Sequence, residues 1–164
     1  MAFWKRSRDG SPREPEPGAP ESLVVRPCYR QFYLRRGEAD WNSDKVSHAG
    51  YERGLEEIGG FVYVGTTMYS SPTSVTVQLH PSDPGLPATA DRAVETAIGG
   101  EGDLAILNWE PGAPAVATIR VPTGRLSARV SWRGLGAAEH HPDNDTGGDE
   151  LSPEYLTIDL WPLG

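Results

Sequence analysis

Residues 29–34 read Tyr-Arg-Gln-Phe-Tyr-Leu, the first run in the sequence with the composition of a folded strand. Side chains of a strand point to alternate faces, so Phe32 and Leu34 share one face and Tyr33 lies on the other. Burial of a large apolar side chain stabilises a fold by roughly 1.5–3 kcal/mol, which predicts that Phe32 and Leu34 face the core. Trp41 follows after a turn and is expected to close one end of that core.

The composition favours a single all-β domain. A chain of 164 residues can bury one sizeable core, and its 19 glycines and 15 prolines indicate many short strands joined by turns. Cys28 is the only cysteine, so an internal disulfide is excluded and a reducing compartment is the simpler interpretation. No window has the apolar length of a membrane span. We therefore expect a cytoplasmic protein with no membrane partner.

Residues 1–21 are predicted to be a disordered arm or linker, and residues 22–164 the folded domain. Within 9–21, four prolines accompany a single apolar residue, too little to offset the entropy of ordering the chain. Phe3-Trp4 near the start leaves open a second interpretation, in which the arm docks to a larger complex and the domain is a structural or assembly module.

The net charge of −8 belongs entirely to the domain, because the acidic and basic residues of 1–21 cancel. Such a surface repels nucleic acid and attracts basic proteins, although a modest negative charge also serves ordinary solubility. No direct binding of nucleic acid is expected.

Runs with strand composition recur at the spacing of a sandwich or barrel, separated by Gly, Pro and Ser. Between residues 40 and 58, Tyr51, Leu55 and Ile58 have helical spacing, but interior glycines favour an irregular segment. Residues 90–98 mix helical and strand signals and are predicted as a strand. The fold class is a single antiparallel β-sandwich of about seven to eight strands. The expected strands are 29–34, 61–68, 74–80, 90–98, 104–109, 115–121, 125–132 and 155–161.

The long segment 136–154 contains acids and no Lys or Arg, which makes it the most acidic part of the predicted surface. Its acids are Glu139, Asp143, Asp145, Asp149, Glu150 and Glu154. Asp143, Asp145 and Glu154 also match part of the spacing of a calcium-binding EF-hand loop. Pro142 and Pro153 exclude the flanking helices of an EF-hand, so calcium is the minor interpretation here.

No motif for catalysis is present: there is no Gly-x-Ser-x-Gly elbow, phosphate-binding loop or dinucleotide fingerprint. His140 and His141 are adjacent and their side chains diverge, so a zinc site is not expected. We predict a protein that is not an enzyme, with no cofactor and no metal. Its aromatic residues leave open a carbohydrate-binding β-sandwich, although strand burial already accounts for Trp109, Trp132 and Trp161.

The order of motifs over residues 27–161 resembles the competence-J family of bacterial nuclease inhibitors. The resemblance is carried by Tyr29-x-Gln31-Phe32, Asp40-Trp41, Gly50-Tyr51, Gly59-Gly60, Val121-Pro122-x-Gly124, a strand ending at Trp132, the acidic loop, and Ile158-Asp159. It implies a small, acidic, non-catalytic protein whose partner is a DNA nuclease.

The charge pattern is compatible with that implication, because carboxylates on a rigid sheet can replace DNA phosphates in a basic cleft. The acids predicted to contact the partner are Asp143, Asp145, Asp149, Glu150 and Glu154, with Glu38 and Asp40 as a second group if the loops cluster at one end. This choice rests on loop charge and not on the family.

Overall fold

The computed structural model describes residues 19–39, 45–110 and 112–164. In these residues the chain forms ten β-strands and two short α-helices. The expectations for residues 1–18, Asp40 and Trp41 lie outside the described residues. No helix in the described part is long and apolar enough to cross a membrane.

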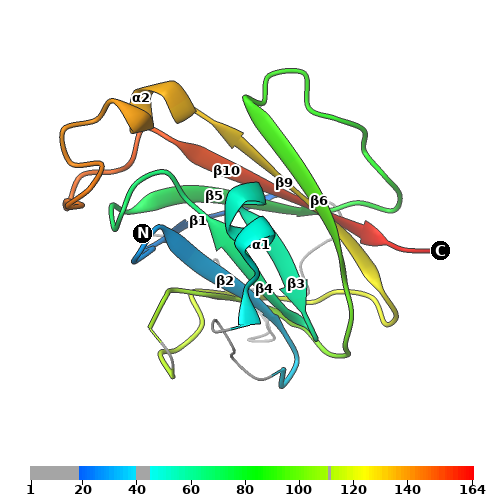
Figure 1. Ribbon diagram of the computed structural model, residues 1–164. Coiled ribbons are helices and arrows are strands. Elements are labelled where there is room, and N and C mark those ends of the chain that lie inside the picture. Colours follow the sequence, from blue (N-terminus) through cyan, green and yellow to red (C-terminus); the bar gives the residue numbers. More distant parts are fainter. Residues whose placement is uncertain (1–18, 40–44, 111) are drawn as a thin grey trace, which may run out of the picture.

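The strands form two five-stranded sheets (Figure 1). Sheet A has the order β1-β5-β10-β9-β6, and sheet B has the order β3-β4-β2-β7-β8. The strands are β1 Glu21–Val25, β2 Gln31–Arg36, β3 Leu55–Ile58, β4 Phe61–Gly65, β5 Thr73–Leu79, β6 Arg92–Ile98, β7 Leu104–Leu107, β8 Ala117–Ile119, β9 Leu126–Arg133 and β10 Tyr155–Pro162, and the helices are α1 His48–Arg53 and α2 Leu135–Glu139.

The all-β class is confirmed, but the predicted antiparallel sandwich of about seven to eight strands is wrong in strand number and in strand direction. Strands β1 and β3 were missed, because Glu21 was assigned to the arm and Glu56-Glu57 gives β3 a polar middle. Strand β10 pairs with β5 in parallel, from Tyr155 opposite Ser74 to Leu160 opposite Leu79. Side-chain alternation is the same for both directions, so the sequence pattern could not reveal this pairing.

The main core lies between the two sheets. Phe32 and Leu34 are fully buried in it, as predicted from their shared face. From sheet A, alternate residues of β5 and β9 pack into the same cluster, including Val75, Val77 and the fully buried Trp132. The period of two in these strands therefore reports burial correctly.

A second apolar cluster covers the other face of sheet B. Tyr33 and Phe61 lie with their ring centroids 4.8 Å apart, and Tyr63, Val46 and Leu107 complete the cluster with Ala105. Strand β2 is consequently buried on both faces, whereas the sequence pattern required burial of only one.

The segment after β2 contains α1, which ends at Gly54 in the left-handed conformation with φ +75°. Leu55 begins β3 and is buried in the core. The helical spacing of Tyr51, Leu55 and Ile58 thus spans a helix and a strand. Residues 92–98 form β6, which confirms the strand predicted there.

Candidate partner-binding surface

The acidic loop between α2 and β10 lies at the end of the sandwich where the β1–β2 turn and the β4–β5 loop also lie, on the left of Figure 1. Its backbone is tied to the β4–β5 loop at two points. The Tyr69 N–H donates to the Asn144 carbonyl at 3.0 Å, and the Ser152 N–H donates to the Pro72 carbonyl at 2.7 Å. The loop is therefore held against the body of the domain.

A third tie joins the loop to the β1–β2 turn. The Arg30 guanidinium forms an ion pair with Asp145 at 2.5 Å and also donates to the Thr67 carbonyl. The Asp145 side chain remains 89% exposed, so its carboxylate keeps a free side toward solvent. One arginine thus connects three loops.

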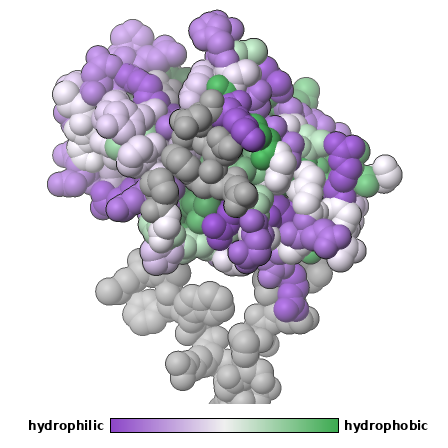
Figure 2. All heavy atoms as spheres, turned by 60° about the horizontal axis from the view of Figure 1, so that its bottom comes forward, coloured by the Kyte–Doolittle hydropathy of each residue, from purple (hydrophilic) through white to green (hydrophobic). Residues whose placement is uncertain are grey.

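Of the acids predicted to contact a partner, Asp145, Asp149 and Glu150 are exposed and Asp143 is half-buried. They all lie between residues 143 and 150, so their charges act on the same region of solvent. Figure 2 shows hydrophilic residues at the end of the molecule that lies on the left of Figure 1, and others spread over the rest of the visible face.

Glu154 does not belong to this exposed group, because it is fully buried at the start of β10. Its Oε1 accepts hydrogen bonds from the backbone N–H groups of Thr67 at 2.8 Å and Met68 at 3.0 Å. Burial raises the pKa of Glu154, and these hydrogen bonds oppose the rise. A side chain in this position holds the β4–β5 loop and has no exposed surface to offer to a partner. The carboxylate that matches the last position of an EF-hand loop is therefore bonded to the Thr67 and Met68 backbone.

Glu38 lies beyond the opposite end of β2, roughly 20 Å of strand away from the acidic loop. There it lines an open cavity of about 780 Å³ together with Glu101 and Asp103. The condition that the loops cluster at one end is therefore not met for Glu38, and Asp40 lies outside the described residues.

Sequence reasoning missed an aromatic cluster beside the acidic loop. Tyr29 is 57% exposed, and its ring centroid lies 5.3 Å from that of Tyr69 and 5.1 Å from that of Trp109. The sequence pattern places Tyr29 in a strand and Trp109 in the core, and Trp109 does pack partly against the second apolar cluster. No local signal marks the turn, because its central residues Tyr29 and Arg30 are not the Gly or Asn that such turns prefer.

A small polar cavity of about 330 Å³ separates the acidic loop from the end of β1. It is lined by Arg26, Ser70, Thr146, Gly147, Gly148 and Asp149. Its walls offer hydroxyl, carboxylate and guanidinium groups, which suit a polar side chain better than an apolar one.

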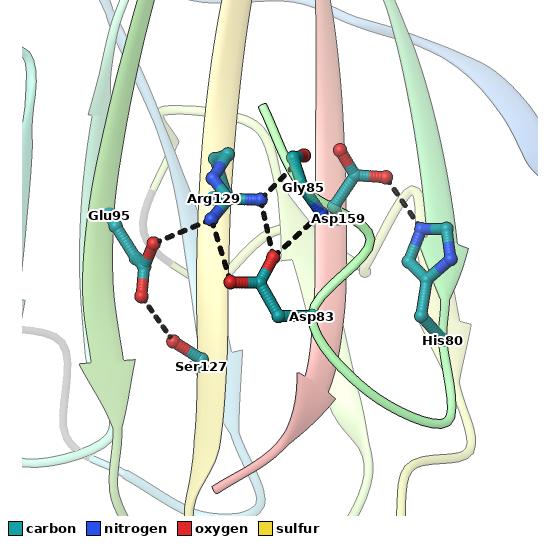
Figure 3. Close-up of polar contacts among 7 residues, drawn as sticks. All are labelled: His80, Asp83, Gly85, Glu95, Ser127, Arg129 and Asp159. Carbon is teal, nitrogen blue, oxygen red and sulfur yellow. Dashed lines mark hydrogen bonds and ion pairs between the residues drawn. The ribbon is translucent and has the colours of Figure 1, made fainter. Parts of the chain in front are cut away.

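A separate polar network covers the outer face of sheet A (Figure 3). Arg129 on β9 donates to Asp83 and to the Gly85 carbonyl at 2.9 and 2.8 Å, and to Glu95 at 2.9 Å. Its guanidinium also lies 4.7 Å from the ring centroid of Trp161. Hydrogen bonds from Arg129 hold the pKa of Asp83 below its ordinary value. This network anchors the loop that follows β5.

The same loop is held at its start by His80, whose Nε2 lies 2.7 Å from Asp159 Oδ1 on β10 (Figure 3).

Among the described residues, no group of three or more His, Cys, Asp or Glu side chains is arranged to hold a metal ion. Cys28 is a free, half-buried thiol.

The class of fold is defined by two five-stranded β-sheets packed around a core. A short helix and an acidic loop precede the last strand. No family model and no curated protein sequence matches the chain. Two solved structures do share the fold, one of them ComJ.

ComJ of Bacillus subtilis, an inhibitor of the DNA-degrading activity of NucA, aligns with a TM-score of 0.58 and 12% identity, over 88% of this chain and 96% of the ComJ chain. The protein described as crocagin biosynthetic gene J aligns with a TM-score of 0.56 and 17% identity, over 89% of this chain and 99% of its own. The chain thus has the ComJ fold, which confirms the predicted resemblance at the level of the fold.

Proposed function

We propose that this chain is a non-catalytic binding protein that inhibits a DNA nuclease by placing its acidic loop against the basic cleft of the enzyme. The observation that carries the proposal is a set of exposed carboxylates, those of Asp145, Asp149 and Glu150, on a loop tied to the body of a ComJ-type fold. A nuclease cleft that binds DNA phosphates attracts carboxylates held in fixed positions.

Rigidity supports the proposal as much as charge does. The ties from Tyr69, Ser152 and Arg30 hold the loop before any partner arrives. A preorganised loop avoids the entropy cost of ordering on binding, so more of the electrostatic attraction appears as affinity.

The first experiment is co-purification of the full chain from its native host, followed by a DNA-cleavage assay of any nuclease recovered, with NucA as a second enzyme. We expect stoichiometric inhibition that weakens as salt is raised, because screening shortens the range of the attraction. A chain that leaves every tested nuclease fully active would contradict the proposal.

The role of the acidic loop is tested with the double variant Asp145→Lys/Asp149→Lys. Its matched control is Glu38→Lys/Glu101→Lys, which changes the charge equally at exposed positions beyond the far end of β2. We expect the loop variant to lower the association rate about tenfold at low salt and the control to lower it much less. Equal effects would show that net charge alone is responsible.

Deletion of residues 1–18 separates the proposal from arm-driven assembly, because β1 begins only at Glu21. Inhibition that survives the deletion assigns binding to the domain. Loss of partner recovery on deletion favours the assembly module.

A further inference from the structure

The β1–β2 turn has an unusual backbone. Tyr29 and Arg30 have φ values of 53° and 62°, and they are the only non-glycine residues with positive φ in the described part of the chain. Cys28 and Gln31 close the turn with reciprocal backbone hydrogen bonds of 3.1 and 3.2 Å. Left-handed conformations disfavour residues with a Cβ, and a two-residue turn of this shape is usually Asn-Gly. Strain kept at an exposed position is characteristic of functional sites.

The turn presents Tyr29 as a supported aromatic ring. The ring of Tyr69 meets it edge-on at 72°, and the ring of Trp109 is tilted at 60° to it. Arg30, the next residue, is held by Asp145 and by the Thr67 carbonyl. A ring fixed by neighbours on two sides loses little entropy on binding, and exposed Tyr and Trp are frequent anchors of protein interfaces.

The charges around this cluster favour a cationic group. Glu110 follows Trp109 directly and is exposed, and the acidic loop contributes Asp149 and Glu150 on the same end of the domain. Of the basic residues near the turn, Arg30 is paired with Asp145, and Arg26 lines a small cavity together with Asp149. The faces of aromatic rings attract cations, and carboxylates beside them add to that attraction.

Arginine is the cation that fits this combination best. Its guanidinium is planar and weakly hydrated, so it stacks on a ring while its N–H groups reach a carboxylate. A lysine ammonium carries the same charge but cannot stack. The chain uses this contact internally, since Arg92 lies over the ring of Trp132 at 4.2 Å and Arg129 over that of Trp161 at 4.7 Å.

We infer that Tyr29, supported by Tyr69 and Trp109, is the anchor for an arginine side chain of a basic protein partner. The inference rests on the proposed function for the basic character of that partner. It assigns the acids to long-range attraction and the aromatic cluster to short-range retention. Loss of the acids then slows association, whereas loss of Tyr29 speeds dissociation.

The test uses a short peptide in which arginine alternates with glycine, and its lysine counterpart of equal charge. Binding is followed by the fluorescence of the chain and by the NMR signals of the Tyr29 ring and the Trp109 indole N–H. We expect the arginine peptide to bind about three- to fivefold more tightly than the lysine peptide. Equal affinities, or shifts confined to other residues, would overturn the inference.

Tyr29→Leu removes the ring and keeps an apolar side chain, and Tyr51→Leu is its matched control. Tyr51 is 46% exposed and meets Tyr63 edge-on at 71°, so it copies the exposure and ring contact of Tyr29 at another site. We expect Tyr29→Leu to abolish the preference for arginine and Tyr51→Leu to preserve it. A preference that survives in Tyr29→Leu counts against the anchor. The NMR shifts of the parent protein test the same point without any substitution, so the result does not depend on the folding of a variant.

The peptide experiment and the nuclease experiment test separate claims, so each result can be interpreted without the other. Inhibition without an arginine preference overturns the anchor and leaves the proposed function standing. An arginine preference without inhibition of any nuclease supports the anchor and removes the nuclease as partner. Cellotetraose is added as a sugar probe, and shifts of the Tyr29 and Trp109 signals by the sugar instead of the arginine peptide would overturn the assignment to arginine.

Discussion

Glu154 and Thr67 are joined by a hydrogen bond of 2.8 Å although they lie 87 residues apart in the sequence. The bond connects the buried start of β10 to the β4–β5 loop, which also contains Tyr69. Glu154 Oε2 has no hydrogen-bond partner among the described residues. Only one oxygen of this buried carboxylate is hydrogen-bonded, so the free energy of unfolding depends on whether the carboxyl group is protonated.

Substitution of Glu154 by Gln should remove a pH-dependent part of the stability. Burial raises the pKa of Glu154 above its ordinary value of 4.5, so the folded state binds the proton more tightly than the unfolded chain does. The ionised side chain therefore lowers the free energy of unfolding at neutral pH. As the pH falls from neutral through the raised pKa toward the ordinary value, the parent should gain stability relative to Glu154→Gln.

Urea unfolding at a series of pH values measures this difference. Glu150→Gln is the control, because Glu150 is exposed on the neighbouring loop. A stability difference between the parent and Glu154→Gln that stays constant with pH would contradict the prediction.

The strained turn should be replaceable at little cost in stability. Tyr29→Asn/Arg30→Gly relieves about 1–2 kcal/mol per left-handed residue, and it loses two ring contacts worth about 0.5–1.5 kcal/mol each and an exposed ion pair worth at most about 1 kcal/mol. Because these gains and losses are of similar size, we expect thermal unfolding close to the temperature of the parent, together with loss of the arginine preference. A destabilised double variant would mean that the ring contacts outweigh the strain.

Two glycines near α2 should respond oppositely to alanine. Gly134 has φ +76°, and a Cβ there would meet the Pro153 carbonyl oxygen at 2.3 Å, whereas a Cβ on Gly136 meets nothing within 4 Å. Gly134→Ala should destabilise the fold by at least about 2 kcal/mol, from left-handed strain and overlap. Gly136→Ala, inside the helix, should stabilise it by about 0.5–1 kcal/mol. Chemical unfolding of both variants measures the contrast, and equal effects would show that the loop around Pro153 yields easily.

Removal of Arg129 should lower stability without affecting partner binding. Its side chain is 5% exposed and bonds to Asp83 and Glu95, which are about half exposed and can be solvated again in the variant. Arg129→Met should cost about 2 kcal/mol, the value of charge-assisted hydrogen bonds, and should speed hydrogen exchange in the loop after β5. Arg125→Met, on the exposed turn before β9, is the control. Weakened nuclease inhibition in folded Arg129→Met would extend the binding surface to sheet A.

The side-chain pattern of single strands was sufficient to predict the class of fold and most of its core. Phe32 and Leu34 in β2, and the alternate residues of β9 up to Trp132, show their burial through a period of two. This period is a local property of extended backbone, so it can be predicted without knowing which strands pair. The acidity of the loop before β10 is equally visible in the sequence.

Tertiary structure alone decided which loops meet. It buried Glu154 under the β4–β5 loop, separated Glu38 from the other acids, and placed Tyr29 beside Trp109. These outcomes depend on the parallel pairing of β5 with β10 and on a turn that lacks glycine. Contacts between distant segments follow from strand order and direction, which side-chain alternation does not encode. The sequence alone therefore determined the alternation of buried and exposed residues within strands and the charge of the loop, and the tertiary structure determined how the strands pair and which residues meet at the surface.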